Sequence, residues 1–146
     1  MIRTFKKGDQ KAIAEIEAEC FSSPWSETAI TESVENGTIF SLFEKDCKVV
    51  GYAGIQIVLD EGYITNIAVK KELRGRGIGS ALLESIKDIA LKKGLRFVSL
   101  EVRRSNTIAI VLYEKHGFKQ VGQRRGFYSN PTEDAIIMTL EGNFEC

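Results

Sequence analysis

A glycine-rich run between a strand-like segment and an amphipathic segment constrains the fold of this chain more than any other feature. The run, 73–80, has glycine at three alternate positions: Gly75, Gly77 and Gly79. Glycine allows a tight turn and a close backbone approach to a ligand, and the first N–H groups of a helix have no partners within it. Segment 63–69 before the run is strand-like, and segment 78–93 has apolar residues at helical spacing. With Arg74 and Arg76 alongside, the run predicts a loop whose main-chain N–H groups bind a phosphate or pyrophosphate.

Two common phosphate-binding loops do not fit the spacing. A P-loop requires lysine and then serine or threonine after its last glycine, whereas Ser80 and Ala81 follow Gly79. A dinucleotide-binding loop requires a third glycine where Ser80 stands. Glu101 lies near the position of the acidic residue in that fingerprint, so a nicotinamide cofactor stays an open alternative. It is disfavoured because that fingerprint normally belongs to the first strand of a sheet, and about half of this chain precedes the loop.

Several segments resemble one known family. Arg74-x-x-Gly77-x-Gly79 resembles the acetyl-coenzyme A loop of the Gcn5-related N-acetyltransferase (GNAT) superfamily. Segment 66–69 resembles the strand that holds the thioester and pantetheine arm in that superfamily. Segments 100–106 and 112–118 resemble its second cofactor and catalytic region. The segments that resemble the RimI-type ribosomal-protein-alanine N-acetyltransferases are 21–27, 124–128 and 133–138.

The resemblance implies an α/β fold in a single domain over residues 1–146, with a central mixed, twisted β-sheet flanked by helices. It implies acetyl-CoA as the cosubstrate, no metal, and a protein N-terminus as the acceptor, specifically the N-terminal alanine of the eighteenth small-subunit ribosomal protein. The loop 129–132 is shorter than in typical bacterial members. Because that loop borders the peptide site, the second and third residues of the substrate stay open.

The pKa values of amines are compatible with an N-terminal α-amine as the acceptor, but they do not require it. An α-amine with a pKa near 8 costs about 1 kcal/mol to deprotonate at about pH 7.4, whereas a lysine with a pKa near 10.4 costs about 4 kcal/mol. One carboxylate base acting through water therefore suffices for an N-terminal amine. The alternative acceptors are a polyamine, an antibiotic or a protein lysine, and a non-catalytic acyl-CoA-binding module is an alternative of another class.

Two side chains are candidates for proton transfer. Glu101, at the carboxyl end of a predicted strand, where open α/β sheets place their clefts, is the candidate general base. A salt-bridged surface carboxylate is the alternative. Tyr113 is the candidate general acid, because a phenol with an ordinary pKa near 10 is protonated at neutral pH and can donate to the departing thiolate. Packing in the core is the alternative for Tyr113, and the resemblance favours the catalytic role for both residues.

Other residues are expected to bind the cofactor, with strand backbone holding the thioester and pantetheine arm and the loop holding the diphosphate. They are Ile67, Ala68, Val69, Arg74, Gly75, Arg76, Gly77, Ile78, Gly79 and Ser80. Asn106 is expected to cap a helix, to bond the cofactor, or both. His116, the single histidine, is explained most simply by the negative end of a helix dipole.

Composition excludes several other classes. The chain has 20 basic and 20 acidic side chains, so its formal net charge is zero and direct nucleic-acid binding is not expected. Cys20, Cys47 and Cys146 are widely spaced, which is typical of free thiols in a reducing compartment, and buried structural cysteines are expected rather than a nucleophile. No apolar run approaches the roughly twenty residues that cross a bilayer. We therefore expect a cytoplasmic protein, monomeric or weakly homodimeric.

Periodicity and turn residues predict the order of the elements. Helices are expected at 9–20 with Asp9 as the cap, at 24–35 with Pro24 in the first turn, at 78–93 and at 106–116. Strands are expected at 1–5, 38–43, 49–59, 63–69, 97–102, 118–125 and 135–140. The side chains of the third helix expected to face the core are Leu82, Leu83, Ile86, Ile89 and Ala90. The aromatic residues expected either in the core or along a peptide groove are Trp25, Tyr63, Phe127 and Tyr128.

Overall fold

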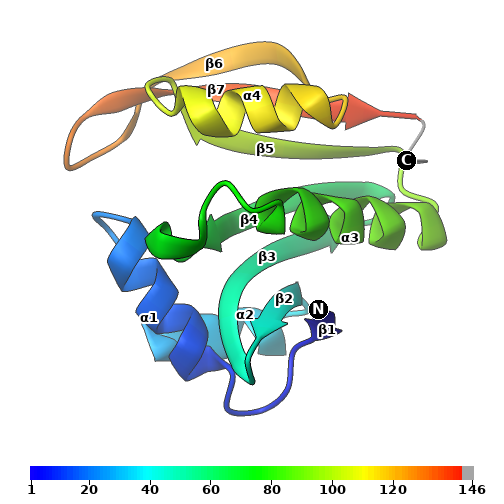
Figure 1. Cartoon of the computed structure of the whole chain (residues 1–146). Helices are drawn as coiled ribbons and strands as arrows, with labels where there is room; N and C mark the ends of the chain where they lie inside the picture. Colours follow the sequence, from blue (N-terminus) through cyan, green and yellow to red (C-terminus); the bar gives the residue numbers. More distant parts are fainter. Residues whose placement is uncertain (143–146) are drawn as a thin grey trace.

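The structure is a computed structural model that describes residues 1–142 (Figure 1). Its helices are α1 (Gln10–Cys20), α2 (Glu27–Glu35), the short 3-10 helix η1 (Lys71–Leu73), α3 (Ile78–Lys92) and α4 (Thr107–Lys115). Its strands are β1 (Ile2–Thr4), β2 (Ile39–Lys45), β3 (Lys48–Val58), β4 (Glu61–Val69), β5 (Phe97–Arg103), β6 (Lys119–Tyr128) and β7 (Glu133–Glu141). The predicted order of strands and helices and the α/β class are confirmed.

Seven strands form one mixed sheet in the order β1-β2-β3-β4-β5-β7-β6. Neighbouring strands are antiparallel except β4 and β5, which are parallel. This parallel pairing is short, because only residues 61–63 of β4 pair with residues 97–99 of β5. The sheet therefore opens between β4 and β5. Strands β1–β4 with α1–α3 lie on one side of the opening, and β5, β6, β7 and α4 lie on the other (Figure 1).

A β-bulge in β4 lies close to the point where the parallel pairing stops. The register with β3 pairs Gly54 with Asn66 and Ile55 with Ile64, which leaves Thr65 as an extra residue. A Cβ atom on Gly54 would lie 2.6 Å from Thr65 Oγ1, so the close approach of the bulge requires glycine there. A bulge bends its strand, and here it accompanies the separation of β4 from β5.

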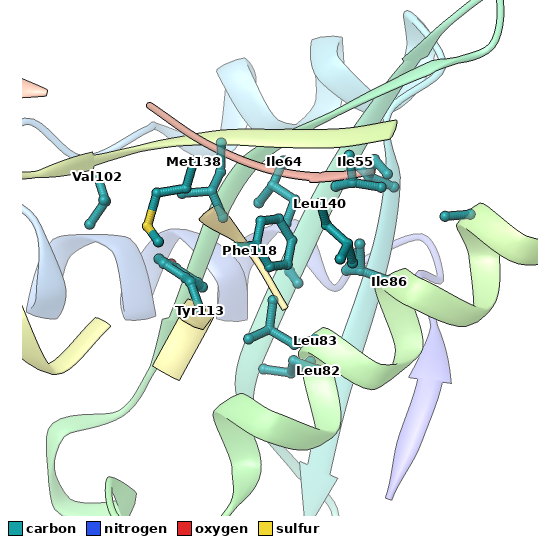
Figure 2. Close-up of a cluster of buried hydrophobic side chains, with 14 of the residues drawn as sticks. Ile55, Ile64, Leu82, Leu83, Ile86, Val102, Tyr113, Phe118, Met138 and Leu140 are labelled. Atoms are coloured by element: carbon teal, nitrogen blue, oxygen red, sulfur yellow. The ribbon is translucent and has the colours of Figure 1, made fainter. Parts of the chain in front are cut away.

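Two apolar clusters cover the two faces of the sheet. The amphipathic helix α3 covers one face, with Leu82, Leu83 and Ile86 fully buried against strand residues and Phe118 (Figure 2). On the other face, the cluster of α1 and α2 with the N-terminal strands includes Ile13, Ile16, Ile30, Phe40 and Tyr52. The core face predicted for α3 is confirmed, with Ala90 buried and Ile89 partly buried.

The start of α2 differs from the prediction. Pro24 was expected in the first turn, but the helix begins at Glu27. Ser26 is the N-cap, and its hydroxyl oxygen accepts a hydrogen bond from the Ala29 N–H at 3.1 Å. A capping hydroxyl satisfies one of the unpaired N–H groups of a helix, which proline cannot do.

The side chain of Asp9 does not cap α1 as predicted. Asp9 stands at the N-cap position but makes no capping hydrogen bond. Its carboxylate instead accepts two hydrogen bonds from the Arg3 guanidinium, at 2.8 and 3.0 Å, and one from the Lys6 N–H at 2.7 Å. Asp9 therefore links strand β1 to the start of α1.

The cysteines are not the buried structural residues that were expected. Cys47 is exposed in the turn between β2 and β3, and Cys20 is half-buried at the end of α1. Both are free thiols, whereas Cys146 lies outside the described residues. No helix within residues 1–142 is long and apolar enough to cross a membrane.

Candidate active site

A cavity of about 610 Å³ lies where β4 and β5 separate. Its walls come from the end of α1 and the segment after it, the bulged part of β4, the carboxyl end of β5, α4, and the connection between β6 and β7. The lining residues that matter most for chemistry are Glu17, Asn66, Ile67, Glu101, Asn106 and Tyr113. Strand β5 and the helix α4 that follows it thus bring the two candidate proton-transfer residues, Glu101 and Tyr113, to one cavity.

Glu101 presents a carboxylate oxygen that no donor satisfies. It stands near the end of β5, and its side chain is 31% exposed. The Oε2 atom is buried and has no hydrogen-bond partner within residues 1–142. Arg124 Nε lies 3.5 Å from this oxygen, which makes an ion pair without the geometry of a hydrogen bond. A buried oxygen in this state can accept a hydrogen bond or a proton from a group that enters the cavity.

Tyr113 is both a core residue and a cavity residue. It is 6% exposed, and its ring lies 5.9 Å from the Phe118 ring, between centroids (Figure 2). Its hydroxyl forms no hydrogen bond in the described part of the chain. Burial, with a smaller contribution from Tyr128, raises the pKa of Tyr113 above its ordinary value, so the phenol stays protonated at neutral pH. The two explanations considered for this tyrosine, packing and proton donation, are therefore compatible.

The glycine-rich loop has the geometry of an anion site. Gly75 and Gly77 have φ values of +80° and +82°, and a Cβ on either would meet nothing within 4 Å. We name residues 75–80 the amide loop. In the part of the chain described, the main-chain N–H groups of the amide loop have no hydrogen-bond acceptor. Gly79 lies close to α4, since a Cβ there would be 3.1 Å from Leu112. Consecutive unpaired N–H groups at the start of a helix form a site for a negative charge.

The Arg74 side chain contacts β4 and α1. Its Nε donates to the Val69 carbonyl at 3.2 Å, and its Nη2 lies 3.3 Å from the Cys20 sulfur. Arg74 therefore ties the amide loop to β4 and α1. Arg76 is exposed beside it.

The backbone of β4 is available on the side facing β5. Lys70 donates its N–H to Val50 of β3, and hydrogen-bonding groups alternate between the two edges of a strand. The main-chain groups of Ile67 and Val69 consequently point toward the opening, and Ile67 lines the cavity. Ala68 is buried in the core and its main-chain groups face β3.

Asn106, which was predicted for the site, and His116, which was assigned to a helix dipole, both have defined contacts. Asn106 caps α4, since its Oδ1 accepts a hydrogen bond from the Ala109 N–H at 3.2 Å, and it also lines the cavity. His116 is not among the residues that line the cavity. Its Nε2 lies 3.1 Å from the Ser80 hydroxyl and its Nδ1 lies 2.8 Å from Glu84, so it joins the end of α4 to the first turns of α3.

Sequence reasoning missed Glu17. Its side chain is 1% exposed, yet it lines the cavity and accepts hydrogen bonds there. The signal was present, because Glu17 follows Ile13 and Ile16 at helical spacing and so belongs to the buried face of α1. A charged residue on a buried helix face is unusual enough to mark a site.

The β6–β7 connection is held by Arg103. The Arg103 guanidinium donates to the carbonyls of Ser129 and Pro131, at 3.0 and 2.9 Å, and lies 4.5 Å from the centre of the Tyr128 ring. It is also paired with Glu133 at 3.3 Å. Arg103 therefore fixes one wall of the cavity.

Comparison with known proteins identifies the family. The model of the acetyltransferase (GNAT) family matches residues 11–118. This chain belongs to the GNAT family. Its GNAT fold accounts for the separated strands and the amide loop, and it decides against the nicotinamide alternative. Like the other members, the protein is an N-acetyltransferase.

Individual GNAT proteins are similar over nearly the whole chain. A Bacillus subtilis (strain 168) protein is 41% identical over 144 residues, covering 97% of this chain and 95% of its own length. The ribosomal protein bS18-alanine N-acetyltransferase of Escherichia coli (strain K12) is 37% identical over 141 residues, covering 95% of each chain. The crystal structure of the ribosomal-protein-S18-alanine N-acetyltransferase from Escherichia coli superposes with a TM-score of 0.90 at 36% identity, over 97% of this chain and 92% of that one.

Proposed function

We propose that this N-acetyltransferase moves the acetyl group of acetyl-CoA to the N-terminal α-amine of a protein, and that the acceptor is the N-terminal alanine of the eighteenth small-subunit ribosomal protein. The observation that carries the proposal is that Glu101 and Tyr113 line one cavity at the opening of the sheet. The names of the full-length relatives support the acceptor.

The donor site follows from the amide loop and β4. The unpaired N–H groups of residues 75–80 suit the diphosphate of the cosubstrate, because fixed donors at a helix start favour negative charge. The outward main-chain groups of Ile67 and Val69 suit the pantetheine arm and the thioester carbonyl. The side-chain NH₂ group of Asn106, whose Oδ1 caps α4, is available for a further hydrogen bond to acetyl-CoA.

Glu101 acts as the general base in this proposal. The acceptor arrives as an ammonium and must lose one proton before its nitrogen can attack. The buried Oε2 of Glu101, which lacks a donor, takes that proton directly or through one water. The neutral nitrogen then attacks the thioester carbonyl carbon, forming the new C–N bond.

Tyr113 acts as the general acid. As the C–S bond breaks, the electron pair moves to sulfur, and the phenol proton passes to the resulting thiolate. The nitrogen, cationic after its attack, loses its second proton through water to the Tyr113 phenolate, which restores the phenol, and Glu101 releases its proton to solvent. The pKa of Tyr113, raised by burial, keeps that proton in place until it is needed. Acetyl passes directly from sulfur to nitrogen in a ternary complex, with no acyl-enzyme intermediate.

The acceptor side of the cavity is aromatic. Trp25, Phe127 and Tyr128 line it, together with residues 129–131 of the loop after β6. Aromatic walls suit the first apolar side chains of an extended peptide. The protein is expected to act on that peptide as a monomer or weak homodimer, without contacting nucleic acid itself.

A thiol-release assay tests the proposal. Purified protein, acetyl-CoA and a short peptide with the N-terminal sequence of that ribosomal protein should release coenzyme A and gain one acetyl group on the α-amine, detected by mass spectrometry. Parallel reactions contain spermidine, an aminoglycoside, and the same peptide with a blocked N-terminus and an internal lysine. Release no faster than background with the free peptide would refute the proposal. Faster acetylation of one of the other acceptors would identify that acceptor as the substrate in place of the peptide.

A further inference from the structure

Glu17 is a buried carboxylate held only by neutral groups. Its oxygens form no ion pair in the part of the chain that the structure describes. Oε1 accepts a hydrogen bond from the Trp25 N–H at 2.9 Å. Oε2 accepts from the Tyr52 hydroxyl and from Asn66 Nδ2, the latter at 2.8 Å. Glu17, on α1, thus joins β3, β4 and the connection between α1 and α2.

These contacts connect the two sides of the cavity. Trp25 lies in the segment that walls the acceptor side. Asn66 directly follows the bulge at Thr65 and directly precedes Ile67, whose backbone faces the opening. One carboxylate therefore sets the position of an acceptor wall relative to the β4 segment that faces the donor.

The energetics of burial explain why each of the three hydrogen bonds to Glu17 matters. A buried carboxylate is costly unless each oxygen accepts hydrogen bonds. All three donors are required, so the loss of any one leaves a buried charge under-solvated. Burial and the neighbouring Glu17 raise the pKa of Tyr52, which keeps its phenol protonated as a donor.

We infer that Glu17 is a positioning residue, which holds the Trp25 segment in register with the β4 segment after the bulge so that the acceptor amine meets the acetyl group. The inference rests on the proposed function for its kinetic part. Its structural part, the anchoring of the Trp25 segment by Glu17, does not depend on which acceptor is used.

The test compares Glu17→Gln with Glu15→Gln, an exposed residue on the same helix. Glutamine has one oxygen and one NH₂ group. Either the Trp25 N–H or the two donors of Tyr52 and Asn66 therefore face the NH₂ group, which is a donor, instead of an acceptor. Trp25 is the single tryptophan, so its fluorescence reports this segment alone. Acrylamide quenching without substrate, the dissociation constant of coenzyme A, and the kcat and KM for the peptide are measured for both variants and the wild type.

For Glu17→Gln we expect stronger quenching of Trp25 and a peptide KM raised about tenfold or more, with coenzyme A affinity unchanged within about twofold. Glu15→Gln should match the wild type. Quenching and KM equal to the wild type would overturn the inference. A parallel loss of coenzyme A affinity would also overturn it, because that result indicates general disruption rather than a misplaced acceptor wall.

A second variant covers the case in which Glu17→Gln does not fold. Tyr52→Phe removes one donor and keeps the ring and the carboxylate, and it should change quenching and KM in the same direction by a smaller factor. No change in Tyr52→Phe would overturn the inference. A wild-type protein that acetylates no N-terminal peptide would refute the proposed function instead, and the quenching comparison would still decide whether Glu17 anchors the segment.

Discussion

Arg124 Nε lies 3.5 Å from Glu101 Oε2, the same oxygen that has no hydrogen-bond donor. Arg124 comes from the edge strand β6, and its guanidinium also lies 5.6 Å from the centre of the Phe127 ring. Both side chains are partly exposed, so solvent weakens the attraction between them. A positively charged acceptor that reaches Glu101 meets an oxygen that is already near one cation. The pair therefore holds Glu101 in place without donating a hydrogen bond to Oε2.

Replacing Glu101 by glutamine should remove the base and keep the shape of the cavity. We expect kcat to fall by about a hundredfold or more, while the dissociation constant of coenzyme A stays the same. Arg124→Gln, which breaks only the ion pair, is the matched control and should retain activity within about tenfold. Steady-state kinetics and calorimetry measure the two quantities, and a Glu101→Gln enzyme as active as the control would exclude Glu101 as the base.

Replacing Tyr113 by phenylalanine should separate catalysis from packing. The ring stays in the core, and the hydroxyl has no hydrogen-bond partner to lose within residues 1–142, so the melting temperature should not fall. We expect kcat to drop by about a hundredfold. Tyr63→Phe, at an exposed tyrosine of β4 outside the cavity lining, serves as the control. If Tyr113→Phe kept wild-type kcat, the thiolate would take its proton from another source.

Alanine at Gly77 should weaken donor binding. A Cβ on Gly77 enters open space beside the amide loop, at a φ of +82° that disfavours side chains. Gly37→Ala is a closely matched control, because Gly37 has a φ of +95°, also meets nothing within 4 Å, and ends α2 far from the loop in sequence. Both variants should lose about 1 kcal/mol of unfolding free energy. Only Gly77→Ala should lose coenzyme A affinity, by about tenfold, in a calorimetric titration.

Lysine at Arg103 should loosen one wall of the cavity. Lysine keeps the charge but cannot make the forked contacts to the carbonyls of Ser129 and Pro131. The KM for the peptide should rise by about tenfold, with coenzyme A affinity unchanged. Arg125→Lys, in exposed β6, is the control. An unchanged peptide KM for Arg103→Lys would show that the loop 129–132 does not contact the acceptor.

Acid should weaken the link between β1 and α1. The Arg3 guanidinium lowers the pKa of Asp9, chiefly through its hydrogen bonds, and desolvation opposes this only in part. A lowered pKa stabilises the folded state above the ordinary value near 4, and this contribution is lost as the pH falls through the folded-state pKa. Asp9→Asn should cost about 1 kcal/mol in urea unfolding at neutral pH and nothing once Asp9 is protonated. Asp88→Asn, in an exposed pair with Lys92, should cost little at either pH.

Most of the local structure followed from sequence pattern. Helix α3 was predicted to within one residue, because its apolar spacing and the left-handed Gly94 after it are local signals. Strand β6 extends to Tyr128, beyond the predicted 118–125, because pairing with β7 rather than its own polar sequence makes it a strand. The start of α2 was misplaced because a nearby serine cap outweighed a proline signal.

The sequence by itself determined the amide loop and the amphipathic helix behind it, and its resemblance to the GNAT superfamily favoured Glu101 and Tyr113 as candidates. The loop and the helix depend on backbone conformation and on residue spacing within one short segment, both of which can be read along the chain. Only the tertiary structure decided that β4 and β5 separate after three paired residues, and that Glu17, Tyr52 and Asn66 meet. Strand pairing and buried hydrogen bonds join residues that are far apart in the sequence, so no local pattern specifies them.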